Sequence, residues 1–159
     1  MRWNLIDKID FLKKGHYATA RKVFKGDEDF FADHFPGNPI VPGPLMLEMI
    51  AQAGGILFGL GIDFKKEIIL AKISNAHILS ELRPPCELFV KVTMNEQREE
   101  GALLSGVVTV GDVQVAKAQI LLAAIEAFDG EAKSKIVFSD SFIRHFNIYE
   151  IAKRSEVLV

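Results

Sequence analysis

The feature that most constrains the fold is an apolar stretch that begins at Pro44 and continues to about Leu60. Proline is favoured in the first turn of a helix, where its missing amide proton has no intrahelical partner to lose. The stretch therefore predicts a helix over residues 44–60. Because almost every face of this helix is apolar, the rest of the chain must enclose it.

Five other segments combine β-branched and apolar residues between turn signals, which is typical of strands. They cover residues 16–24, 67–79, 86–97, 102–110 and 113–125. Gly111-Asp112 and Glu99-Glu100-Gly101 fit tight hairpins between the last three segments. We therefore predict an α+β fold in which an antiparallel sheet wraps around one long central helix.

A chain of 159 residues that is 49% hydrophobic is long enough to bury one sizeable core. We expect one domain over residues 1–126 and a C-terminal extension over residues 127–159. The run from Asp129 to Lys133 is predicted to be a polar linker. Residues 139–154 favour a short helix whose inward side carries Phe142, Ile143, Phe146 and Ile151.

The charge balance and cysteine content exclude several classes of protein. The net charge is only -2, so no global field favours nucleic acid. The single cysteine, Cys86, rules out an internal disulfide and argues against a thiolate zinc site, and we expect no metal and no cofactor. The N-terminal residues mix acidic and basic side chains, and the apolar run contains Glu48 and Gln52. We therefore expect a cytoplasmic protein without membrane insertion.

The segment over residues 30–52 carries the chemistry. Four of the chain's six prolines lie in it, and each one fixes its own φ and restricts the residue before it. They are Pro36, Pro39, Pro42 and Pro44. A loop with so little freedom positions side chains well.

Three groups in this segment are the parts of an acid–base site. His34 supplies an imidazole, the side chain that most often acts as a general base. Glu48 lies in an otherwise apolar helix, where a protonated carboxyl can act as an acid, and Gln52 follows on the same face within hydrogen-bonding reach. Gly43 precedes the helix, so its amide lies at the positive end of the helix dipole and can polarise a carbonyl oxygen. These parts suit abstraction of a proton beside a thioester carbonyl.

The sequence resembles the β-hydroxyacyl-acyl carrier protein dehydratases of bacterial type II fatty acid synthesis, the FabZ/FabA group with the hotdog fold. The signature of that group is matched by His34-Phe35-Pro36-Gly37, Pro39, Pro42-Gly43, Leu45, Glu48 and Ala51-Gln52. The similarity extends from about Leu5 to Ala124.

The resemblance implies a fold, a reaction and a set of roles. His34 of one subunit and Glu48 of its dimer mate would be the catalytic pair, and Gly43, Gln52 and Phe35 would bind the substrate. The substrate would arrive on the phosphopantetheine arm of acyl carrier protein, the expected partner. A homodimer, or a trimer of such dimers, is the implied assembly. The glutamate at position 48 resembles the branch that dehydrates without isomerising the double bond.

Two of the departures from the family's pattern lie in the motif segment. Asp33 stands where the family usually has glycine before the histidine, which adds a carboxylate beside His34. Pro44 stands where a residue with an amide proton is usual, so Gly43 would act alone as the oxyanion donor.

Other functions remain open at this stage. An acyl thioesterase on the same fold would use a helix carboxylate to activate water, and a non-catalytic acyl-binding subunit would explain the departures at Asp33 and Pro44. At the level of single residues, Gln52 can equally hold a loop in place, and Gly43 can merely start the helix. Neither the acyl chain length nor the pathway follows from the residues.

Overall fold

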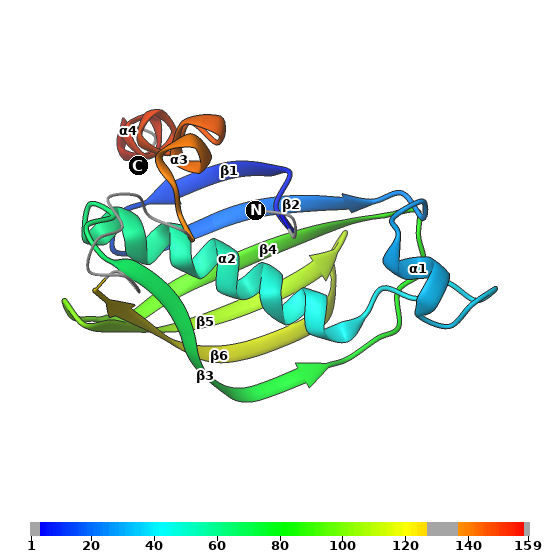
Figure 1. Cartoon of the computed structure of the whole chain (residues 1–159). Helices are drawn as coiled ribbons and strands as arrows, with labels where there is room; N and C mark the ends of the chain where they lie inside the picture. Colours follow the sequence, from blue (N-terminus) through cyan, green and yellow to red (C-terminus); the bar gives the residue numbers. More distant parts are fainter. Residues whose placement is uncertain (1–3, 127–136, 158–159) are drawn as a thin grey trace.

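The computed structural model describes residues 4–126 and 137–157, and there one antiparallel sheet surrounds a central helix (Figure 1). The strands are β1 Lys8–Lys13, β2 Tyr17–Phe24, β3 Glu67–Ile78, β4 Cys86–Gln97, β5 Gly101–Val110 and β6 Val113–Ile125. The helices are α1 Phe30–Asp33, α2 Gly43–Gly61, α3 Asp140–His145 and α4 Ile148–Val157. The predicted α+β arrangement is confirmed.

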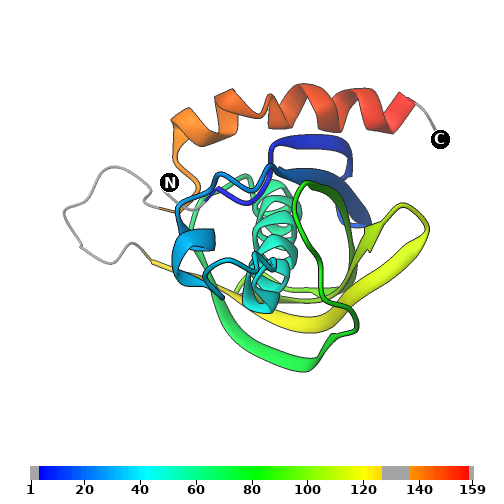
Figure 2. The same ribbon diagram turned by 90° about the vertical axis from the view of Figure 1, so that its right-hand side faces the viewer.

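The strand order in the sheet is β1-β2-β4-β5-β6-β3, and every neighbouring pair is antiparallel. The predicted hairpins join β4, β5 and β6 into a meander, while β3 pairs with the outer side of β6. Register irregularities interrupt the pairs β1/β2, β3/β6, β4/β5 and β5/β6. Because such bulges bend strands, the sheet curves around α2 (Figure 2).

Helix α2 forms the centre of the core. Every residue from Met49 to Leu60 is buried, and Ile50 occupies the space over Gly106 of β5. In the described part of the chain, α2 alone has the length and mean hydropathy of a membrane span, and 72% of that stretch is buried within the protein. The observed helix exceeds the predicted range of 44–60 by one residue at each end.

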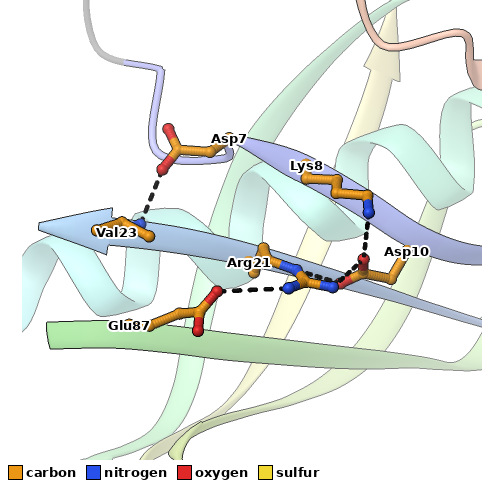
Figure 3. A network of polar contacts seen from close by, with 6 residues as sticks. All are labelled: Asp7, Lys8, Asp10, Arg21, Val23 and Glu87. Atoms are coloured by element: carbon orange, nitrogen blue, oxygen red, sulfur yellow. Dashed lines mark hydrogen bonds and ion pairs between the residues drawn. The ribbon is translucent and has the colours of Figure 1, made fainter.

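Polar contacts tie β1, β2 and β4 together on the outer side of the sheet (Figure 3). Arg21 of β2 donates to both carboxylate oxygens of Asp10 on β1, at 2.6 and 2.9 Å, and lies 3.4 Å from Glu87 of β4. The hydrogen bond to Asp10, followed by its charge, raises the pKa of Arg21. The network fixes the strand nearest the C-terminal extension to the rest of the sheet.

The C-terminal extension contains two helices instead of the single helix predicted over residues 139–154. Asn147 has a φ of 50°, and this left-handed residue separates α3 from α4. Ile143 and Phe146 point into the core as predicted, and the amide of Leu12 in β1 donates to Ser155 Oγ at 3.1 Å. Helix α4 therefore covers β1 (Figure 2). The predicted linker over residues 129–133 lies outside the described residues.

Candidate active site

Glu48 and Gln52 form a fixed polar pair in the second and third turns of α2. The Gln52 amide nitrogen donates to Glu48 Oε1 at 3.0 Å, while the Gln52 oxygen accepts from the amide of Leu5 at 2.9 Å. Gln52 is only 3% exposed. The hydrogen bond predicted between the two side chains is present, and the contact with Leu5 fixes the orientation of the Gln52 amide group.

This pair lines a cavity of about 230 Å³. Positions 48, 51, 52 and 55 share one helical face, so the α2 wall of the cavity consists of Glu48, Ala51, Gln52 and Gly55. The remaining walls are apolar and come from three distant segments: Ile68, Ile69 and Leu70 of β3, Leu122 of β6, and Val137 and Phe138 before α3. A carboxyl group beside an apolar chamber suits a substrate with a reactive carbon and a hydrocarbon tail.

Gly43 begins α2 and lies directly under the end of β3. A Cβ atom on Gly43 would lie 3.0 Å from Ile78 Cγ1, which explains why a residue without a side chain fits there. As the first residue of the helix, Gly43 has an amide with no intrahelical acceptor. Pro44 follows in the first turn, which tolerates its missing amide. The positive end of α2 is therefore available to an anionic oxygen through Gly43.

His34 and Phe35 lie in the loop after α1, beyond the N-terminal end of α2 (Figure 1). The His34 amide donates to the Phe30 carbonyl at 2.9 Å, and its ring meets Phe35 edge to face at 4.6 Å. Phe35 is 56% exposed and has a φ of 55°, an unusual backbone for a bulky residue. Asp33 closes α1 and is exposed. The loop thus presents an aromatic side chain to the outside.

Within one chain, the predicted catalytic pair is not brought together. In the part of the chain that the structure describes, neither a hydrogen bond nor an ion pair joins His34 to Glu48. His34 also does not line the cavity that contains Glu48. Within one chain, Glu48 with its cavity and the histidine loop are therefore two separate features.

Sequence reasoning missed the apolar walls of this cavity. Val137 and Phe138 lie more than ten positions after the end of β6, and no motif marks them. The only signal is Gly55: a Cβ atom there would lie 2.5 Å from Phe138 Cζ, and a glycine inside a buried helix indicates such a close approach. Gly55 lies in the helix that the sequence predicts, but the sequence does not identify Phe138 as its neighbour.

Other reactive groups do not add to the site. Burial, followed by the charge of Glu28, raises the pKa of the Cys86 thiol, which disfavours the nucleophilic thiolate. Among the described residues, no group of three or more His, Cys, Asp or Glu side chains is arranged to hold a metal ion.

The sequence is similar to a known family of proteins. Residues 1–119 match the FabA-like domain family. A 3-hydroxyacyl-acyl-carrier-protein dehydratase FabZ from Legionella pneumophila strain Corby is 37% identical over 126 residues, covering 77% of this chain and 84% of the relative. A FabZ dehydratase from Hydrogenobaculum sp. is 34% identical over 125 residues, with the same coverage of 77% and 84%.

Solved structures share the fold at low identity. The dehydratase heterocomplex ApeI:P from Xenorhabdus doucetiae superposes with a TM-score of 0.66 at 12% identity, covering 77% of this chain and 83% of that chain. A Streptococcus mutans protein bound to acetyl CoA superposes with a TM-score of 0.58 at 13% identity, covering 77% and 90%. At these identities the likeness establishes the fold alone.

Proposed function

The chain belongs to the FabA-like family, and from this membership we infer that it is a 3-hydroxyacyl-acyl-carrier-protein dehydratase of fatty acid biosynthesis. The reaction is a hydro-lyase step that converts a 3-hydroxyacyl group into a trans-2-enoyl group. The observation in the structure that supports it best is Glu48, held by Gln52 at an apolar cavity. The thioesterase and the non-catalytic alternatives are not favoured, because both relatives are named as dehydratases.

The residues divide the reaction into two proton transfers. His34 takes the proton from the α carbon as the general base, and the electron pair of that bond forms the new double bond. Glu48 acts as the general acid and donates a proton to the departing β hydroxyl, which leaves as water. The Gly43 amide donates to the thioester oxygen while negative charge develops on it. The proton on His34 then passes back to Glu48 through solvent, and the site is restored.

This mechanism requires a site that two chains share. A single chain leaves the His34 loop apart from the Glu48 cavity, and one edge of its sheet is open. Strand β3 is an edge strand whose exposed residues include Leu70, Ile73 and Ile78. Because such an edge is a ready template for another chain, we place the second subunit along β3, so that its Phe35 and His34 reach the cavity of the first.

The substrate reaches this site as a thioester on acyl carrier protein, which we propose as the partner. Phe35 covers the reacting group there and Gly43 binds the carbonyl, while Gln52 lines the cavity that receives the substrate and orients Glu48. The proposed compartment is the cytoplasm. The acid–base scheme needs no metal or organic cofactor.

Hydration of an enoyl thioester on acyl carrier protein tests this function. Loss of the absorbance of the conjugated thioester would be followed with the wild-type chain, His34→Ala, Glu48→Gln and the control variant His16→Ala. His16 lies in the exposed turn before β2 and is outside the proposed machinery. We expect wild type and His16→Ala to turn over alike, and the two site variants to lose about two to four orders of magnitude.

Thermal midpoints of the four proteins separate chemistry from folding. Neither site variant should shift its midpoint by more than a few degrees, because His34 is in a surface loop and Glu48 is half-buried. A wild-type chain without turnover at any chain length, yet with a normal midpoint, contradicts the dehydratase assignment.

A further inference from the structure

We propose that Phe138, carried by the C-terminal extension, closes the far end of the acyl chamber and limits the length of the acyl chain that the enzyme accepts. The inference deepens the proposed function and rests on it. It starts from the cavity beside Glu48, which is open to a hydrocarbon chain along one face of α2 and meets the Phe138 ring at the far end of that face.

The ring is held firmly in place. Phe138 is 5% exposed and lies against the backbone of Gly55, where any side chain on α2 would displace it. Its centroid lies 6.0 Å from that of Phe64 and 5.4 Å from that of Phe142. Aromatic packing on two sides leaves the ring little freedom to swing aside.

The backbone beside the ring is anchored as well. The amide of Val137 donates to Glu67 Oε2 at 3.2 Å, and the carboxyl group of Glu67 is buried at the beginning of β3. The segment before α3 thereby descends from the outer helices to the side of α2 (Figure 1). A wall that combines a partly buried hydrogen bond with a buried ring is rigid enough to act as a stop.

The position of the Phe138 ring sets the length of acyl chain that fits in the chamber. Glu48 and Gly55 are two turns apart on the same face of α2, which corresponds to about 10 Å. An extended chain of three bonds spans about 3.5 Å, and carbon atoms in contact remain about 4 Å apart. Roughly five to eight carbon–carbon bonds therefore fit between the reacting carbon and the ring. This favours acyl groups of medium length, from octanoyl to about decanoyl.

Binding of inert ligands tests the stop without relying on turnover. Saturated acyl-pantetheine thioesters from butyryl to palmitoyl lack the hydroxyl that would leave, so they report binding alone. Their Kd would be measured by calorimetry with the wild-type chain, Phe138→Ala, Phe138→Trp and Phe146→Ala. Phe146 is a matched control, because it is a buried phenylalanine of the same extension that does not line the cavity.

Each methylene that the chamber accepts should tighten binding about fourfold, up to the length at which the chain meets the ring. For the wild type we expect the gain to stop near octanoyl or decanoyl. Phe138→Ala should move that limit to longer chains and Phe138→Trp should move it to shorter ones, while Phe146→Ala leaves it unchanged. Opposite shifts from two substitutions at one position are not produced by a general loss of folding.

Two outcomes overturn the inference: a chain-length limit that is the same in wild type, Phe138→Ala and Phe138→Trp, or a limit that Phe146→Ala moves as far as Phe138→Ala does. The enoyl hydration assay on the same preparations separates this result from the assignment of function. If the chains hydrate the enoyl thioester but the chain-length limit does not move, the dehydratase assignment stands and the role of Phe138 is wrong. If the limit moves in chains that show no turnover, the role of Phe138 stands and the dehydratase assignment is wrong.

Discussion

At the scale of single residues, Gln52 links the N-terminal segment to the side chain of Glu48. Its amide oxygen accepts from Leu5 in the segment before β1, and its amide nitrogen donates to Glu48 in the cavity. A glutamine has one acceptor and one donor group, and here each serves one of these tasks. The side chain that holds Glu48 therefore also connects the N-terminal segment to α2.

Replacement of Gln52 by alanine should impair stability and turnover together. The buried Leu5 amide would lose its acceptor, which costs about 1–3 kcal/mol in the free energy of unfolding, and Glu48 would lose its fixed orientation. Urea unfolding and initial rates of hydration measure the two effects. Gln119→Ala, at an exposed site on β6, should change the free energy by less than about 0.5 kcal/mol. Equal behaviour of the two variants would contradict the role given to Gln52.

Cys86 should react slowly with thiol reagents at neutral pH. Burial, and then the negative charge of Glu28, raises its pKa, so the thiolate fraction at a given pH is smaller than in the unfolded chain. The rate of reaction with an aromatic disulfide should therefore rise at a higher pH in the native protein than in urea. Glu28→Gln should move the native profile toward lower pH. A native profile that coincides with the unfolded one argues against this environment.

At the scale of elements, the sequence predicted the long regular segments and missed the short or interrupted ones. The strands β2 to β6 and helix α2 carry strong periodicity, and each agrees with its predicted range to within one residue. Strand β1 was not predicted, because a bulge between Ile9 and Phe11 breaks its alternation of apolar and polar residues. Helix α1 was not predicted, because it is too short to show a helical period. The residues of the motif loop were identifiable, whereas the Phe138 wall depends on tertiary packing that no local pattern encodes.

The extension should contribute measurably to stability through α4. Ser155 Oγ accepts from the buried amide of Leu12, so Ser155→Ala leaves that amide without an acceptor and should cost about 1–3 kcal/mol in the free energy of unfolding. Ser141→Ala, which removes an exposed hydroxyl in α3, serves as the control. Chemical unfolding at equilibrium compares them. A cost below about 0.5 kcal/mol for Ser155→Ala would show that α4 is only loosely attached to β1.

At the scale of the whole molecule, the two edges of the sheet differ. Helix α4 covers the β1 edge, whereas the exposed residues of the β3 edge include the apolar Leu70, Ile73 and Ile78. The Glu48 cavity takes part of its wall from β3, whereas the His34 loop follows α1 and lies apart from that cavity. The association that we propose along β3 would pair the open edge and bring His34 of one chain to the Glu48 cavity of the other.

The most direct test of this account is complementation between two inactive chains. His34→Ala and Glu48→Gln subunits with different affinity tags would be co-expressed, purified as heterodimers and assayed for hydration of an enoyl thioester on acyl carrier protein. A shared site predicts that each heterodimer contains one intact site and one doubly altered site, and therefore about half the wild-type turnover per dimer. Verified heterodimers that are as inactive as either parent homodimer would contradict a site built from His34 of one chain and Glu48 of the other.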